Sequence, residues 1–305
     1  MLRTNKKELM ASIIGCGIVL AIILFAVLAR QSSDPLPLNT VYTNVLEKRK
    51  VVAQMRIQLL QAVALEKNAV MALTDQQSRE FADQSREAAQ QVTRETENLA
   101  TLLRTLPAQD EADLLDEFRG CWTELGQLDE RILELAVANT NLKAMALSHT
   151  KGTALLRQFE EQLEQLRQAS MNMPEQDRID ALLSRALVAV LKISNLHSAH
   201  IAEPAREGMT KIEQQIETEA ATAQQTIADL GHLMGQEDAN LRQAGDRFTA
   251  FLALTTEVLA LSRQNSNFES LELSLGRKRI IAAQCDETLA QLQKILQKKP
   301  LQPTK

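Results

Sequence analysis

The sequence predicts an all-α protein in which an N-terminal transmembrane helix is followed by two tandem antiparallel four-helix bundles. Three observations lead to this prediction: the composition, an uncharged apolar run near the N-terminus, and a long internal repeat. Only 3% of the 305 residues are aromatic, whereas strands favour aromatic and β-branched side chains. Good helix formers such as Ala, Leu, Gln and Glu dominate, and 45% hydrophobic content allows a sizeable core.

The apolar run covers residues 11–29 and contains no charged side chain. Its length matches the roughly 20 residues that a membrane-spanning helix needs. Arg3, Lys6 and Lys7 precede it, so the positive-inside rule places residues 1–10 in the cytoplasm and the chain after Arg30 outside. We therefore expect a single-pass protein of the bacterial inner membrane with its C-terminal part in the periplasm.

Two other interpretations of this run remain open. It would be a cleaved signal peptide if processing occurred after Ala29, or a lipoprotein signal if Cys16 were modified. The anchor is favoured because the run is long for a signal peptide and lies mostly after Cys16. Residues 30–40 follow as a linker, since Pro35 and Pro37 disfavour helix, and no second apolar run of spanning length occurs.

An internal duplication sets the predicted architecture. Placing Trp122 over Phe248, an offset of 126 residues (248 − 122), aligns the two chain segments without a gap. In this frame Asn139-Thr140-Asn141 falls over Asn265-Ser266-Asn267, a coincidence that low-complexity helices seldom produce. Two copies of one structural unit are therefore expected.

The first halves of the copies match more weakly, at an offset of 131 that places Leu65 over Leu196 (196 − 65). Prolines and glycines divide each copy into four helical runs, near 40–73, 76–106, 110–149 and 152–170, and near 177–202, 205–231, 237–275 and 277–298. The predicted domains are a bundle over 41–170, a linker over 171–176, a bundle over 177–298 and a tail over 299–305. The alternative is that the two copies share long helices, as in stacked bimodular sensors.

Apolar residues at alternating spacings of three and four give these runs the seam of a bundle or coiled coil. Asn139 and Asn265 interrupt otherwise apolar seams. Such an amide either fixes the register through a buried hydrogen bond between helices or lines a small-molecule pocket. On the second interpretation the candidate ligand-binding residues are Asn139, Thr140, Asn141, Asn265, Ser266 and Asn267.

Cysteine and histidine residues are expected to pack rather than react. Cys121 lies on a seam and Cys285 replaces a core position of the other copy, so two buried thiols are favoured over a disulfide that would join the copies. His197 and His200 could hold a metal with Glu203, but they continue an apolar row and are expected in the core. No metal and no cofactor are predicted.

Composition and spacing also exclude function classes. The net charge is −5 and no basic stripe with interleaved aromatics occurs, so no nucleic-acid partner is expected. The sequence has no Ser/His/Asp or Cys/His arrangement, no glycine-rich phosphate loop and no metal-spaced cysteine pair. The chain is therefore predicted not to be an enzyme.

Three segments carry a family resemblance: residues 66–75 (EKNAVMALTD), 117–126 (EFRGCWTELG) and 135–144 (LAVANTNLKA). They resemble the four-helix-bundle ligand-binding domain of bacterial methyl-accepting chemotaxis receptors. The resemblance implies a periplasmic sensor fold, often dimeric, that binds small ligands or partner proteins. Unlike such receptors, the 305-residue sequence shows no second apolar run of spanning length and no cytoplasmic signalling hairpin.

The function expected from these features is a membrane-anchored extracytoplasmic sensor-like module for signal transduction. It would bind a small ligand or a partner membrane protein and would form a homodimer. The alternative is a structural spacer or docking protein of the cell envelope that acts through the surfaces of its bundles.

Overall fold

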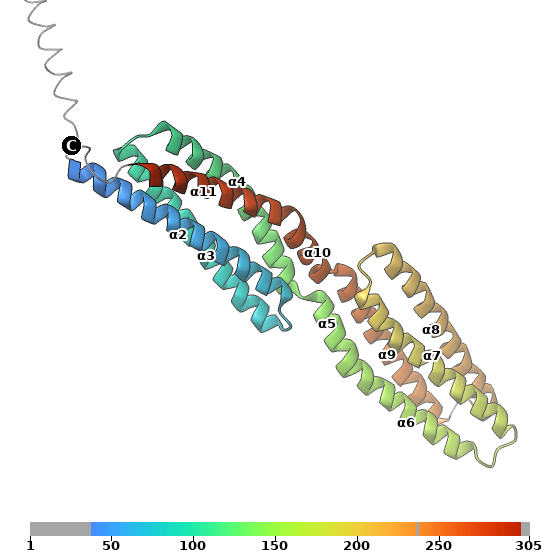
Figure 1. Cartoon of the computed structure of the whole chain (residues 1–305). Helices are drawn as coiled ribbons and strands as arrows, with labels where there is room; N and C mark the ends of the chain where they lie inside the picture. Colours follow the sequence, from blue (N-terminus) through green and yellow to red (C-terminus); the bar gives the residue numbers. More distant parts are fainter. Residues whose placement is uncertain (1–37, 236–237, 300–305) are drawn as a thin grey trace, which may run out of the picture.

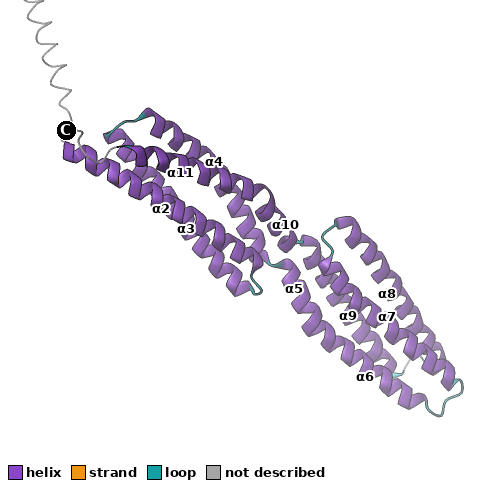
Figure 2. Ribbon diagram, in the orientation of Figure 1, coloured by secondary structure: helices purple, strands orange, loops and turns teal. Residues whose placement is uncertain are grey.

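The computed structural model describes residues 38–235 and 238–299, and every regular element within them is helical (Figures 1 and 2). The predicted all-α class is thereby confirmed. The predicted membrane span over residues 11–29 lies outside the described residues. Within residues 38–235 and 238–299, no helix is long and apolar enough to cross a membrane.

Two helical hairpins and two long interrupted helices build the molecule. The hairpins are α2 (Leu38–Met71) with α3 (Asp75–Thr105), and α7 (Gln176–Ala202) with α8 (Arg206–Met234). The first long helix runs through α4 (Gln109–Ala138), α5 (Thr140–Leu147), a π-helical turn η1 (Ser148–Gly152) and α6 (Thr153–Ser170). The second runs through α9 (Ala239–Gln264), α10 (Ser266–Leu273), a π-helical turn η2 (Ser274–Lys278) and α11 (Arg279–Lys298).

The helices do not form consecutive bundles over 41–170 and 177–298, and this prediction is corrected. The first bundle consists of α2, α3, α4 and α11, and the second of α6, α7, α8 and α9. Figure 1 shows the two bundles end to end, with α11 lying beside α2 although they are far apart in sequence. Each bundle therefore takes its fourth helix from the other copy, which is the shared-helix alternative.

The physical reason is that the predicted turns near 149–152 and 275–277 do not reverse the chain. Gly152 keeps right-handed helical dihedral angles, with φ −60° and ψ −49°, so the helix continues through it. At Gly276 the backbone leaves the helical region, with φ −89° and ψ −109°, so η2 contains a kink, but α11 continues beyond it without a reversing loop. The breaks occur instead at Asn139 and Asn265, where α4 leaves the first bundle and α9 leaves the second.

Apolar side chains fill the interior of both bundles. The first core runs along α2, α3, α4 and α11 and includes Met55, Val92, Phe118 and Leu289, each at most 1% exposed. The second runs along α6 to α9 and includes a contact between Phe159 and Phe248 with ring centroids 6.2 Å apart. Because both cores contain helices from each copy, neither copy can bury its apolar faces without the other.

The free end of the first bundle carries a buried ion pair. Lys48 and Glu111 are each 1% exposed, and Nζ lies 2.9 Å from the carboxylate. Lys48 also donates to the carbonyl of Leu106, which follows the last turn of α3. This lysine therefore ties α2 to the turn between α3 and α4.

Candidate functional site at the joint between the bundles

The six predicted site residues come together where the two long helices pass from one bundle to the other, a region here called the joint. Asn139 and Asn265 both have left-handed backbone conformations, with φ of 48° and 53°. Asparagine tolerates this conformation better than most residues, which explains its presence at both breaks. Each break ends one helix and starts the next one residue later, so the N-termini of α5 and α10 meet at the joint.

These two N-termini cap each other. The Thr140 backbone N–H donates to Ser266 Oγ at 3.0 Å, and the Ser266 backbone N–H donates to Thr140 Oγ1 at 3.1 Å. A hydroxyl normally caps the first turn of its own helix, but here each hydroxyl caps the helix of the other copy. The arrangement is a local two-fold pair, and the 126-residue offset relates its members.

The flanking asparagines repeat this reciprocity. The Asn141 N–H donates to Asn267 Oδ1 at 3.1 Å, and the Asn267 N–H donates to Asn141 Oδ1 at 3.3 Å. Their amide groups reach the residues at the breaks: Asn141 Nδ2 lies 3.1 Å from Asn265 Oδ1, and Asn267 Nδ2 lies 2.9 Å from Asn139 Oδ1. The predicted hydrogen bonding between helices is therefore present, whereas ligand binding by these six residues stays a prediction.

One asymmetry breaks the pairing. Asn265 Nδ2 donates to the carbonyl of Pro204 in the α7–α8 turn. Asn139 is completely buried, and its Nδ2 has no hydrogen-bond partner among the described residues. A buried unpaired donor costs roughly 1–3 kcal/mol, so the joint is less well satisfied on the side of the first bundle.

Ion pairs join the helices on either side of the joint. Lys143 of α5 lies 3.4 Å from Asp75 of α3 and also donates to the carbonyl of Ala138 at the end of α4. Arg131 of α4 lies 3.0 Å from Glu269 of α10. Both pairs are about half exposed and therefore add little stability.

His197 lies in the core of the second bundle near the joint. Its ring is fully buried, with Nδ1 3.0 Å from Ser148 Oγ and Nε2 3.1 Å from Thr255 Oγ1. The ring also stacks on Phe251 with centroids 5.7 Å apart. Burial, and after it the nearby His200, lower the pKa of His197 to about 4, so His197 is neutral at pH 7.

His200 lies one turn closer to the joint and is also fully buried. Its Nδ1 lies 2.8 Å from Ser262 Oγ, and its Nε2 lies 2.9 Å from Glu213 Oε1. A hydrogen bond from Arg263 is the main reason that the pKa of Glu213 is lowered. The predicted core position of both histidines is confirmed, and no group of three metal-ligating residues occurs within the described ranges 38–235 and 238–299.

The first bundle holds a charged cluster at the equivalent depth. Glu66, Asp129 and Lys278 are 0%, 7% and 1% exposed, and Lys278 Nζ lies 2.6 Å from a carboxylate oxygen of each acid. Glu66 Oε1 accepts no hydrogen bond from the described residues. Burial raises the pKa of Asp129, and Lys278 offsets this effect only in part. Two carboxylates thus share one ammonium group in a desolvated site.

Sequence reasoning missed this cluster, although the repeat contains a signal for it. At the offset of 131, Glu66 corresponds to His197, and at the offset of 126, Lys278 corresponds to Gly152. The second bundle therefore has a glycine at residue 152 and a neutral histidine at residue 197, where the first bundle has Lys278 and Glu66. A charged residue in one copy and an uncharged residue in the other, at a core position, would have indicated the site.

A groove between α3 and α4 opens onto this cluster. Its volume is about 280 Å³, and Asp129 forms part of its floor. Arg86 and Glu130 lie at its rim and form a two-point ion pair, with distances of 3.2 and 3.0 Å. The lining side chains belong to Ser85, Arg86, Ala89, Gln90, Thr93, Trp122, Gly126, Asp129, Glu130 and Leu133.

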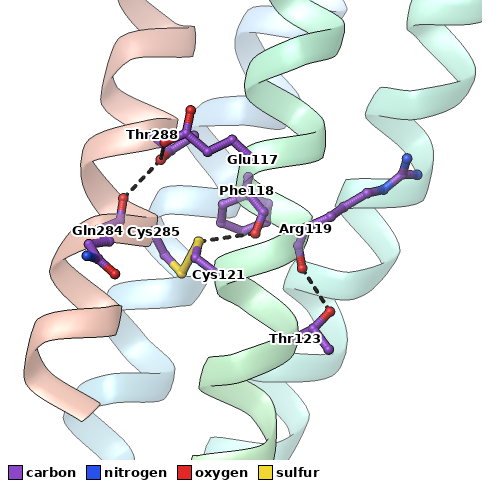
Figure 3. The surroundings of a disulfide bond; sticks show 8 residues. All are labelled: Glu117, Phe118, Arg119, Cys121, Thr123, Gln284, Cys285 and Thr288. Carbon is purple, nitrogen blue, oxygen red and sulfur yellow. Dashed lines mark hydrogen bonds between the residues drawn. A yellow bond between two sulfur atoms is a disulfide. The ribbon is translucent and has the colours of Figure 1, made fainter. Parts of the chain in front are cut away.

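A disulfide joins Cys121 of α4 to Cys285 of α11, with the Cα atoms 5.7 Å apart (Figure 3). The prediction of two separate packed thiols is therefore wrong. It failed because the serial arrangement placed the two cysteines in different bundles, whereas the shared-helix arrangement makes α4 and α11 neighbours. The bond links the two copies across the first bundle, 164 residues apart in sequence.

Comparison with known proteins agrees with the helical architecture. The family described as a four-helix-bundle sensory module for signal transduction matches residues 6–180. This match covers more than half of the 305 residues, and the chain belongs to this family of sensory modules.

A solved structure of the TorS sensor domain in complex with TorT, in the presence of TMAO, is similar at 14% sequence identity and a TM-score of 0.44. The alignment covers 83% of this chain and 100% of that chain. A comparison with curated proteins gives no match.

Proposed function

We propose that this chain is a membrane-anchored, extracytoplasmic sensory module that binds a small ligand or a partner membrane protein and passes the resulting change through the joint. The observation that carries the proposal is that both long helices run through both bundles and cross at the joint. Each bundle is therefore joined to the other by two chain segments, and a movement in one bundle can reach the other only through the joint. Membership of the sensory four-helix-bundle family supports the same function.

Residues 11–29 are the proposed anchor. The matched family region begins at residue 6 and includes them, and α2 begins at Leu38 shortly afterwards. The start of α2 and the end of α11 lie at the same end of the molecule (Figure 1). A movement carried along either helix would therefore arrive next to the proposed anchor. The disulfide between Cys121 and Cys285 supports an oxidising compartment such as the periplasm, where such bonds persist.

The proposed homodimer forms through a second apolar stripe on α2. Tyr42, Leu46, Ile57, Leu60 and Met71 lie at helical spacings on the face of α2 that no other described helix covers, and each is 44–72% exposed. An uncovered apolar stripe of this length suits pairing with an identical helix. A parallel pair would place both proposed anchors in one membrane.

The alternative role as an envelope spacer is supported by the shape of the molecule. The two bundles lie end to end and form an elongated body rather than a compact one (Figure 2). In that role the joint would set a fixed angle, and no ligand would be required.

Three measurements on the full chain test the proposal. A phosphatase fusion after residue 305 should be active and a green fluorescent protein fusion dark if the C-terminus is periplasmic. Thermal unfolding in nonionic detergent, screened against amino acids, organic acids and amines, should show a ligand-dependent shift. Crosslinking in cells that recovers a stoichiometric envelope partner, together with no response to any compound, would favour the spacer.

The dimer has its own matched test. Ile57→Asp places a charge on the α2 stripe and should convert the dimer to a monomer in size-exclusion chromatography with light scattering. Val188→Asp is the control, because Val188 is similarly exposed but lies on α7 of the second bundle. A wild-type chain that is monomeric at all accessible concentrations contradicts the dimer.

A further inference from the structure

The groove between α3 and α4 differs in its side chains from the equivalent part of the second copy. Gly126 lines the groove between α3 and α4, and a Cβ atom added there would meet no other atom within 4 Å. At the offset of 126 residues its counterpart is Leu252, whose side chain packs against the second core. The second copy therefore fills with a leucine the space that the first copy leaves open.

The floor of the groove differs in the same way. Asp129 is 93% buried, lines the groove and belongs to the cluster in which two carboxylates share Lys278. Its counterpart Thr255 is a neutral residue that bonds to His197 and to its own helix. At these two positions the second copy has a packed leucine and a neutral threonine. The first copy has an open groove and a buried carboxylate.

The remaining wall is apolar on one side and polar on the other. Trp122 is half-buried and stacks on Phe118 with ring centroids 6.0 Å apart. Its indole N–H donates a hydrogen bond to Thr93 Oγ1. Its counterpart Phe248 is buried at 4% exposure. The exposed groove side chain Gln90 offers a further oxygen acceptor, whereas both carboxylate oxygens of Glu130 accept from Arg86.

The charges around the groove define what it can take. Arg86 is paired with Glu130 and Asp83, so its guanidinium is already neutralised. Asp129 and Glu66 share one lysine, which leaves one uncompensated negative charge in a site of low dielectric constant. Hydrated divalent metal ions prefer several converging oxygen ligands, whereas this groove has one buried carboxylate beside an aromatic wall. An organic cation fits this combination better.

We propose that the groove between α3 and α4 binds a small primary ammonium ion, with the ammonium group on Asp129 and the carbon chain against Trp122. The inference rests on the proposed sensory function and names the ligand class of that site. A volume of about 280 Å³ lies at the lower end of the range for small-molecule sites, which suits a small ligand. Charge pairing with Asp129 supplies orientation, and the indole supplies the apolar contact.

Trp122 is the only tryptophan in the 305-residue chain, so intrinsic fluorescence reports directly on the groove. The test titrates the full chain in nonionic detergent with propylammonium chloride, and in parallel with sodium propionate and sodium chloride at equal ionic strength. The expected result is a saturable change in emission with propylammonium alone. No saturable change in the folded protein, or an equal change with either sodium salt, overturns the proposal.

Two variants with matched controls locate the site. Gly126→Leu introduces the side chain of the second copy and should weaken binding at least tenfold, whereas Gly120→Leu, at an open position of the same helix outside the groove, should not. Asp129→Asn removes the charge with little change in shape and should also weaken binding at least tenfold, and Asp116→Asn should not. Unchanged affinity in either folded groove variant overturns the proposal.

These results separate the ligand class from the broader function. If propylammonium does not bind but another compound shifts thermal unfolding, the sensory function stands and the ammonium assignment fails. If no compound shifts unfolding and the reporter fusions place the C-terminus in the cytoplasm, the proposed function itself fails.

Discussion

Replacing Asn141 with alanine tests whether the joint stabilises the molecule. The Asn141 side chain donates to the carbonyl of Ile201 and to Asn265 Oδ1, both at 3.1 Å, and accepts from the Asn267 N–H at 3.3 Å. A net contribution of about 0.5–1.5 kcal/mol for each of these three buried or partly buried bonds predicts a loss of about 2–4 kcal/mol. The Asn267 N–H in the first turn of α10 would also lose its cap.

The measurement is urea unfolding of the full chain in nonionic detergent, followed by circular dichroism at 222 nm. Asn141→Ala should lower the free energy of unfolding and leave the slope with urea unchanged, because the surface exposed on unfolding stays the same. Asn98→Ala is the matched control, since Asn98 lies exposed on α3 with one bond to Glu95, and its effect should remain within about 0.5 kcal/mol. Equal effects of the two substitutions would show that the hydrogen bonds at the joint contribute nothing to stability.

The emission of Trp122 gives the same experiment a second probe. It reports on the first bundle alone, whereas circular dichroism reports on both bundles. Because each bundle contains a long helix from the other copy, the two probes should show coincident transitions. Two separated transitions would refute the reasoning that the shared helices make the bundles one cooperative unit.

Three further predictions concern the interiors of the bundles. Reduction of the Cys121–Cys285 bond should lower the free energy of unfolding by about 2–5 kcal/mol, because it closes a loop of 164 residues; the double serine variant, which no longer responds to reductant, is the check. Lys278→Met leaves two buried carboxylates unpaired and should cost about 3–5 kcal/mol at pH 7 in the same urea assay, and a neutral result would mean that the acids are protonated. The pKa of His197 is about 4, below the value near 6.5 of the unfolded chain, so the unfolded state binds the proton first. Stability should therefore fall by up to about 1.4 kcal/mol per pH unit between about pH 6.5 and 4, and a His197→Gln variant with the same pH profile would contradict this.

Helix positions were predictable from the sequence, but the assignment of helices to bundles was not. The predicted runs 76–106 and 177–202 agree with α3 and α7, respectively, within one residue at each end. The choice of bundle failed because α6 and α11 come from equivalent parts of the two copies and carry similar apolar stripes. Either helix is compatible with either bundle, so the periodicity of the side chains does not distinguish them.

The turns at Asn139 and Asn265 determine which helices belong to which bundle, and the seam pattern did not predict their geometry. Spacing placed both residues on rows that face other helices: Asn139 is fully buried, Asn265 is partly buried, and both amides bond between helices. A seam position implies a continuous helix, however, whereas both residues have left-handed conformations that end one helix and begin another. The repeated Asn-Thr-Asn and Asn-Ser-Asn segments are helix breaks with reciprocal caps.

The distribution of bonds suggests where movement occurs. In the first bundle α11 is held to α4 by the disulfide and to α2 by Arg56, which contacts Asp286 at 2.8 and 3.1 Å. The joint has neither a covalent link nor a buried ion pair among the described residues, and it contains the unpaired Asn139 amide. A movement that reaches the joint from the second bundle therefore meets a first bundle in which α11, the helix contributed by the second copy, is fixed to its neighbours. Because α11 cannot slide independently of α2 and α4, bending at the joint is the remaining way in which one bundle affects the other, and the first bundle would transmit it to the proposed anchor as a rigid body.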